Sequence, residues 1–494
     1  MAETGRLALR GSLFVALSDY LLQVVSIVFS IVLTRQLAPD DFGILAMATV
    51  IYSVIERPRI IGLPQLLIAR QDPSDQVIGT HFALSTFMSA SIGILVLALS
   101  PMLLRFYSRQ TVYVLLCLAA IHLFDNNGLS ATTEALLTKE LHFGRLSTLH
   151  IIATISSLLL AIAAAVIGLG VWSLVIREGV RIIIQCTGTW ILTPRRPRWS
   201  FDWQTAKDFL RQGWHMWVSG LSGFVVFNYD DFLVGNLLGD SALGLYSRAY
   251  HYAKLPMSPL APVYSVTAPT YARLHADAKR LSRAYELLLT AVVLIAFPAA
   301  ALMALAAPEL VTILLTDRWG GVAPLLRFLL PYSLLRSIRD GTYSLVVALG
   351  QPQVLSRIGV VESVVMVIAC TLLTWWFGAA GAAISAAIPV LIGLVLLHHR
   401  FLRHAVSVDY WGILLRPLLS LLAGILCPVA LLAIVSITAP GLRLAIKLGL
   451  GGAIFGLSLF LLQRQRLVEE LSYIYRLAVG KHRPQIAPSD IDAD

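Results

Sequence analysis

Long apolar runs follow one another along almost the whole chain and are separated only by short polar turns. An α-helix of about 20 apolar residues crosses a bilayer, whereas strands of alternating polarity would not give such continuous runs. The sequence therefore predicts an all-α integral membrane protein with fourteen spans. The predicted limits are 11–34, 42–68, 79–99, 112–137, 149–169, 171–192, 213–236, 243–268, 285–306, 322–348, 356–376, 379–399, 412–436 and 442–462.

The basic residues fit a membrane topology better than a nucleic-acid surface. The formal net charge is +10, but Lys and Arg lie in short loops and form no single patch. With the N-terminus in the cytoplasm, the tails and even-numbered loops hold 23 of them and the odd-numbered loops hold six. The positive-inside rule then predicts cytoplasmic termini, and no nucleic-acid partner is expected.

Signals of enzymatic chemistry are missing from the sequence. The four cysteines fall inside predicted spans without the spacing of a metal site or a disulfide framework. No nucleotide-binding or hydrolase motif occurs, and the short external loops leave no room for an extramembrane catalytic domain. We therefore expect a protein that is not an enzyme and that needs neither cofactor nor metal.

The largest cytoplasmic connection divides the predicted spans into six and eight. Two lobes of six helices are expected, followed by two extra helices and a polar tail. The predicted units are an N-lobe at 1–192, a linker at 193–212, a C-lobe at 213–400, spans 13 and 14 within 401–463, and a cytoplasmic tail at 464–494.

A weak internal repeat supports this division. RQLAPDDFGILAMA (35–48) aligns with NLLGDSALGLYSRA (236–249) at a constant shift of 201, and the alignment pairs Gly43 with Gly244. Each copy joins the first two spans of a predicted lobe. Because six spans is an even number, the lobes would share one orientation and be related by an axis along the membrane normal.

Charged residues inside the spans are the best indication of function. A charge at the bilayer centre costs about 2.5–3.5 kcal/mol on insertion scales, so such residues normally face the protein interior or a watery cavity. The candidate substrate-binding residues are Arg57, Arg59, Arg177, Arg181, Arg248, Lys254, Arg336, Arg339 and Tyr250. The candidates for ion coupling or charge pairing are Asp19, Glu56, Asp125, Asp230, Asp231 and Glu362.

Four segments carry most of these charges, and each has a plainer interpretation. In ERPR (56–59) an internal Glu–Arg pair would neutralise itself and leave one Arg over, which suits a multivalent anion such as phosphate. The basic residues of REGVR (177–181) could instead snorkel to the membrane surface. In 244–269 the tyrosines and prolines suggest a broken helix beside a pathway or an interfacial anchor. LLRSIRDG (334–341) again has more cations than acids.

Asp230 and Asp231 stand side by side within an apolar run. Adjacent helical residues point about 100° apart, so the two carboxylates would face different surroundings. They could pair with embedded Arg or Lys, or one could take up a proton or Na⁺ in exchange for such a pairing.

Five phrases of the sequence form a spaced series over roughly residues 10 to 400. They are LTRQLAPDDFGILAMA, ALLTKELHFGRL, NYDDFLVGNLLGDSALGLYSRAY, DRWGGVAPLLRFLLPYSLLRS and ALGQPQVLSRIG. In these phrases the chain resembles the Wzx-type polysaccharide transporters, particularly their colanic-acid exporter-like branch. In that family the polar residues of span 7 are often Asn-Ala-Asp, so Asp231 matches the recurrent acid and Asp230 is a departure.

The resemblance implies the multidrug/oligosaccharidyl-lipid/polysaccharide exporter fold, with two six-helix lobes around a central cavity. It also implies a flippase of the bacterial inner membrane that moves undecaprenyl-diphosphate-linked oligosaccharide repeat units by alternating access, for exopolysaccharide, O-antigen or capsule assembly. Na⁺ or H⁺ would be the coupling ion, and membrane lipid and the polysaccharide polymerase machinery would be partners. The alternatives are a lipid II flippase, a drug/cation antiporter, or a membrane glycan ligase, which would need reactive groups outside the membrane.

Overall fold

The computed structural model describes residues 20–275, 277–435, 437 and 439–462, and every regular element within them is helical. The predicted spans fall mainly on helices in these residues, with non-helical breaks at 60–62 in the second span and at 125–130 in the fourth. Six helices of the described part are individually long and apolar enough to cross a membrane. Most of the other spans are bent or broken, which is why they need neighbouring helices to satisfy their backbone groups.

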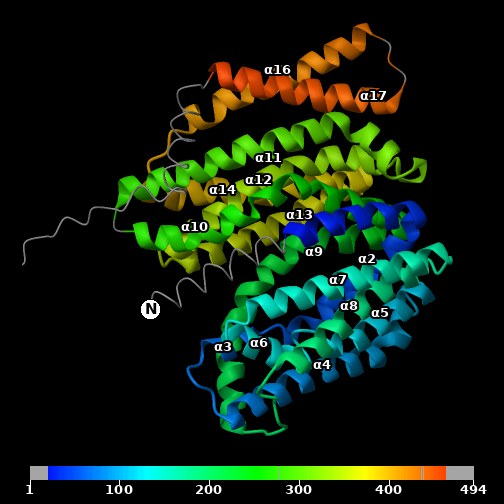
Figure 1. The fold of residues 1–494 in the computed structure, drawn as a ribbon, viewed down its shortest axis with the longest axis vertical. Helices are drawn as coiled ribbons and strands as arrows, with labels where there is room; N and C mark the ends of the chain where they lie inside the picture. The colour runs from blue at the N-terminus through cyan, green and yellow to red at the C-terminus, as the bar shows by residue number, and fades with distance from the viewer. Residues whose placement is uncertain (1–19, 276, 436, 438, 463–494) are drawn as a thin grey trace, which may run out of the picture.

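Most of the first bundle occupies the lower part of the molecule as drawn in Figure 1, and its first helix, in dark blue, lies nearer the middle. Its elements are the helix Tyr20–Gln36, α2 (Pro39–Glu56), η1 (Arg57–Arg59), α3 (Leu63–Ala69), α4 (Asp75–Leu103), α5 (Arg109–Ile121), η2 (His122–Phe124), α6 (Ala131–Lys139), α7 (Phe143–Val166) and α8 (Val171–Leu192).

Most of the second bundle lies above the first, and α16 and α17 cover its outer side, but its first helix, α9, runs from the lower end of the molecule along the first bundle (Figure 1). Its elements are α9 (Trp203–Ala253), η3 (Leu255–Leu260), α10 (Ala261–Leu274), α11 (Ala278–Leu314), η4 (Asp317–Trp319), α12 (Val322–Ala348), α13 (Pro352–Ser385), α14 (Ala387–Leu397), η5 (His398–Leu402), α15 (Arg403–Ala405), α16 (Tyr410–Ile434), α17 (Pro440–Ala445) and η6 (Ile446–Leu450).

Proline and glycine set the places where spans break or reverse. Pro58 lies in the 3₁₀ turn after α2, and Pro256 and Pro259 lie in the 3₁₀ segment η3. Proline removes a backbone donor and clashes with the preceding turn, so a regular helix does not continue through these sites. Gly239 (φ 84°) and Gly378 (φ 60°) interrupt α9 and α13 in the left-handed region that glycine tolerates.

The two copies of the repeated sequence meet each other reciprocally. A Cβ on Gly43 would lie 1.7 Å from the carbonyl oxygen of Asp240, and one on Gly244 would lie 1.9 Å from that of Pro39. Asp240 and Pro39 are themselves 201 positions apart, like the two glycines. Such exchange of partners is the relation expected at a two-fold contact, and it requires glycine on both sides.

A buried ion pair joins the last span to α11 of the second bundle. Lys447 Nζ donates to Glu309 Oε1 at 2.7 Å and Oε2 at 2.8 Å, and both side chains are buried. Glu309 lies beyond the predicted end of span 9 at residue 306, because α11 continues to Leu314. The sequence analysis did not single out this pair, since its members are 138 residues apart.

Candidate functional site

A cavity of about 460 Å³ lies between α9, α12 and α13 of the second bundle. Arg336, Arg339 and Asp340 line it from α12, where their i, i+3 and i+4 spacing places them on one helical face. Phe227 of α9 and Tyr343 of α12 add aromatic walls. Cationic and aromatic groups therefore gather around one cavity within the spans.

Arg336 keeps part of its donor capacity available in this cavity. Its Nη1 donates to Tyr332 Oη at 2.6 Å, and its Nε lies 3.5 Å from Asp340 Oδ2. The guanidinium carbon stands 4.4 Å from the ring centroid of Phe227. Its side chain is 23% exposed, and its hydrogen bonds to the residues that the structure describes use two of the five N–H donors of a guanidinium.

Arg339 is more strongly neutralised than Arg336. Its Nη2 donates to Glu362 Oε2 at 2.7 Å, and Tyr343 donates to the other oxygen of Glu362 at 3.3 Å. A Cβ on Gly393 of α14 would lie 2.0 Å from Glu362 Oε1, so glycine there makes room for the carboxylate. Arg339 lines the cavity, whereas Glu362 does not, so the pair holds Arg339 from outside the lining.

The first bundle contains a closed ionic cluster around Arg59. Its Nη2 donates to Glu56 Oε2 at 2.8 Å and to Asp125 Oδ2 at 2.7 Å, while its Nη1 donates to Ser89 Oγ at 2.7 Å and His122 O at 3.1 Å. Arg59 is 3% exposed. This geometry favours a structural role for Arg59, Glu56 and Asp125, rather than the substrate contact predicted for Arg59.

The remaining predicted cations lie on several elements. The guanidinium of Arg57 stands over Phe224 of α9 at 5.0 Å, so it reaches from the first bundle to the second. Arg248 stands over Phe42 at 4.3 Å and lies within electrostatic range of Arg177. These contacts bring three of the predicted cations to the boundary between the bundles.

Two further cations have neighbours within their own bundle. Arg181 forms a salt bridge with Glu178, one turn earlier on α8. Lys254 is exposed and stands over the ring of Tyr250 at 4.1 Å. Tyr250 in turn donates to Tyr332 Oη at 2.6 Å and so connects Lys254 to the surroundings of Arg336.

Asp230 and Asp231 form no ion pair with any residue that the structure describes. Tyr246 donates to Asp230 Oδ2 at 2.5 Å, but Oδ1 of each aspartate is buried without a hydrogen-bond partner. Lys254 and Arg248 lie within electrostatic range of Asp231. Asp19, which the sequence analysis also proposed for ion coupling or charge pairing, lies outside the described residues.

The sequence analysis missed three aromatic residues at this site, two that line the cavity and one, Tyr332, that contacts Arg336. Phe227, Tyr332 and Tyr343 were not singled out, although Tyr332 precedes Arg336 by four positions and Tyr343 follows Arg339 by four. This i, i+4 spacing of aromatic and basic residues is a signal for contact along one helix. Phe227 shows no such signal, because it comes from another helix.

The protein family described as polysaccharide biosynthesis protein matches residues 32–324. The succinoglycan biosynthesis transport protein ExoT of Rhizobium meliloti (strain 1021) is 26% identical over 302 residues, which cover 60% of this chain and 60% of that protein. The chain thus matches less than two thirds of that relative. The lipopolysaccharide biosynthesis protein WzxC of Escherichia coli (strain K12) is 21% identical over 81% of this chain and 82% of its own length.

The fold has a close counterpart among solved structures. The lipid II flippase MurJ in an inward closed conformation superposes with a TM-score of 0.73, covering 92% of this chain and 100% of that one at 11% sequence identity. At this identity the likeness establishes the helical architecture of the chain.

Proposed function

This chain belongs to the polysaccharide biosynthesis protein family, and from that membership we propose that it is a flippase for undecaprenyl-diphosphate-linked oligosaccharide repeat units. It acts in the bacterial inner membrane with both termini in the cytoplasm, and it serves the assembly of exopolysaccharide, O-antigen or capsule. It is a transporter and not an enzyme. Polysaccharide polymerase machinery takes up the oligosaccharide after transfer.

The observation that carries this proposal is the cationic and aromatic cavity at Arg336. A lipid-linked diphosphate brings a multivalent anion and a polar glycan into the membrane, while its long lipid stays among the acyl chains. Guanidinium groups match phosphate geometry with paired donors, and the rings of Phe227 and Tyr343 offer faces for sugars. The cavity volume of about 460 Å³ suits a head group of a few rings.

Arg336 is the principal diphosphate contact in this proposal, and Arg339 supports it from the pair with Glu362. Arg57, Arg177, Arg248 and Lys254 extend the cationic surface toward the boundary between the bundles. These cations attract the diphosphate before it enters the cavity or after it leaves. Cations along a transport path raise the local concentration of an anionic ligand.

Ion coupling is assigned to Asp231 with Asp230. A buried carboxylate without an ion-pair partner is costly, so it is stabilised when it takes up H⁺ or Na⁺. Asp230 is connected to Tyr246, while Tyr250 and Tyr332 lead to Arg336, and the rings of Tyr246 and Tyr250 are 6.1 Å apart. Uptake of H⁺ or Na⁺ at the two aspartates can thus change the electrostatic potential in the cavity lined by Arg336.

A complementation experiment tests the proposed function. Cells lacking this chain should lose surface polysaccharide and accumulate undecaprenyl-diphosphate-linked oligosaccharide on the cytoplasmic leaflet, and the wild-type chain should reverse both effects. A second strain, depleted of its lipid II flippase, serves as the comparison. Rescue of that strain without any effect on surface polysaccharide would assign the chain to lipid II transport instead.

Ion coupling has its own test in proteoliposomes. We expect an imposed H⁺ or Na⁺ gradient to accelerate transfer of the lipid-linked oligosaccharide by the wild-type chain. Asp231→Asn should bind the substrate yet fail to respond to either gradient. A full gradient response of both Asp231→Asn and Asp230→Asn would refute the assignment.

A further inference from the structure

The π-helical turn η5 and the short helix α15 carry a basic sequence that the proposed transport path does not use. This sequence is HHRFLRH at 398–404. π-turns are rare departures from α-helical geometry and occur frequently at functional sites. Two cavities flank the turn, and it contributes residues to both.

The first of these cavities, the polar cavity, has a volume of about 410 Å³ and a lining in which polar side chains stand beside apolar ones. Its polar lining comes from Arg400 and His404, which are one turn apart, and from His275 and Gln351 of two other connections. Positive-inside topology places all of these connections at the cytoplasmic surface. His275 Nδ1 lies 2.8 Å from Ala272 O, which leaves the other ring nitrogen for a ligand.

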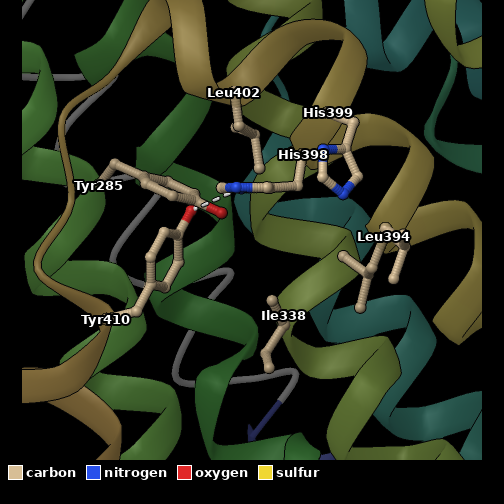
Figure 2. A pocket seen from close by; sticks show the side chains of 8 residues that line it. Tyr285, Ile338, Leu394, His398, His399, Leu402 and Tyr410 are labelled. Carbon is tan, nitrogen blue, oxygen red and sulfur yellow. Dashed lines mark hydrogen bonds between the residues drawn. The ribbon is translucent and has the colours of Figure 1, made fainter.

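The second cavity is apolar and has a volume of about 310 Å³ (Figure 2). Ile338, Leu394 and Leu402 supply aliphatic walls from α12, α14 and η5. His398 and Tyr410 close one side, with Tyr410 Oη 3.3 Å from His398 Nδ1 (Figure 2). The cavity surface as a whole is almost entirely apolar.

The two cavities follow one another along α11. Leu281 lines the polar cavity, and Tyr285, one turn further along the helix, lines the apolar cavity. Because α11 begins at Ala278 on the cytoplasmic side, the polar cavity lies at the membrane surface and the apolar cavity lies deeper. A phospholipid likewise has a polar head group at the membrane surface and apolar acyl chains below it.

We infer that an anionic phospholipid of the cytoplasmic leaflet binds at this turn. Its phosphate lies in the polar cavity with Arg400 and His404, and one acyl chain lies against Leu394 and Leu402 of the apolar cavity. Basic pockets between transmembrane helices on the cytoplasmic side are typical sites for anionic head groups. The site is separate from the cavity of Arg336 and binds a resident lipid of the bilayer rather than the transported one.

The test uses the purified full-length chain and native mass spectrometry with three lipids: dioleoyl phosphatidylglycerol, dioleoyl phosphatidylcholine and undecaprenyl phosphate. We expect the wild-type chain to retain phosphatidylglycerol in preference to the other two. Arg400→Gln should weaken phosphatidylglycerol binding about fivefold, the factor for about 1 kcal/mol per basic side chain near an anionic surface. Arg273→Gln is the matched control, because Arg273 is an exposed cation near the polar cavity but outside its lining.

A second pair of variants tests the acyl-chain cavity. Val395 lines the apolar cavity, whereas Leu391 is an exposed residue one turn earlier that does not. Val395→Trp should fill the cavity and reduce phosphatidylglycerol retention, while Leu391→Trp should leave it unchanged.

Three outcomes would overturn the inference. The first is equal weakening by Arg273→Gln and Arg400→Gln, which would show a general surface potential. The second is preferential retention of undecaprenyl phosphate, with the same dependence on Arg400, which would make this a substrate site. The third is phosphatidylglycerol binding that neither Arg400→Gln nor Val395→Trp changes while both variants keep the wild-type unfolding temperature.

Discussion

Arg59 of the first bundle and Arg336 of the second both lie within predicted membrane spans, yet their surroundings differ. Arg59 is enclosed by two carboxylates, a hydroxyl and a carbonyl. Arg336 has a tyrosine hydroxyl at 2.6 Å, a single carboxylate at 3.5 Å and a cavity in front of it. An embedded arginine is therefore available to a ligand only where the protein leaves its donors unsaturated.

The largest expected effect is on the closed cluster. Arg59→Ala would remove the buried cation that Glu56 and Asp125 share, and leave Asp125 with only His122 beside it. Loss of one partner costs about 3–5 kcal/mol in a buried pair. We expect most of the protein to disappear from the membrane, measured by immunoblot of membrane fractions.

Neutralising the whole cluster should be much milder. Glu56→Gln, Arg59→Met and Asp125→Asn together remove all three charges, and such complete replacements are often neutral. Normal membrane levels of Arg59→Ala combined with loss of polysaccharide would contradict the structural role and return Arg59 to the transport path.

The next effect separates transport from folding. Arg336→Ala should reduce surface polysaccharide by about ten- to a hundredfold, because losing a hydrogen bond to a charged group costs about 1.5–3 kcal/mol. Membrane levels should stay normal, since Arg336 lines a cavity and no buried carboxylate depends on it alone. Unchanged polysaccharide output at normal protein levels would remove Arg336 from the proposed site.

The two bundles should respond alike at their reciprocal contact. Gly43→Ala and Gly244→Ala each place a Cβ against a backbone carbonyl, so each should destabilise the protein by about 1–3 kcal/mol, as overpacking does. The unfolding temperature in detergent measures this effect. Gly441→Ala is the control, since a Cβ there meets nothing within 4 Å. A large difference between Gly43→Ala and Gly244→Ala would argue against a two-fold contact.

The smallest effect is expected at an exposed ion pair of the first bundle. Arg195 lies 2.5 Å from Asp75, and both side chains are largely exposed. Exposed pairs contribute about 0–1 kcal/mol, so Arg195→Gln should leave membrane levels and polysaccharide output near wild type. If Arg195→Gln lowered the membrane level of the protein as much as Arg59→Ala, burial would not explain why ion pairs differ in their contribution to stability.

Much of the fold could be predicted from the sequence, because apolar runs of membrane length must be helical. The limits 171–192 and 322–348 match α8 and α12 residue for residue. The resemblance to Wzx-type polysaccharide transporters is confirmed at the level of the family. The extension of α11 to Leu314 could not be predicted, since Glu309 is stabilised there by Lys447 from a distant span.

The candidate site could be predicted only in part. The sequence analysis singled out the segment that holds Arg336, Arg339 and Asp340 for its excess of cations, and the structure places all three at one cavity. It could not show that Asp125, 66 positions away, neutralises Arg59. Residues 56–59 contain one more cation than acid, but Asp125 reduces this surplus in the folded protein. A count within the segment misses partners that come from other parts of the chain.

The most direct test of the central claim is the affinity of the purified chain for undecaprenyl diphosphate relative to undecaprenol, which lacks the anion. We expect the wild-type chain and the neutral triple variant at positions 56, 59 and 125 to prefer the diphosphate. Arg336→Ala should lose at least about tenfold of that preference. An undiminished preference in Arg336→Ala, or its loss in the triple variant, would contradict the assignment of the anion site to the second bundle.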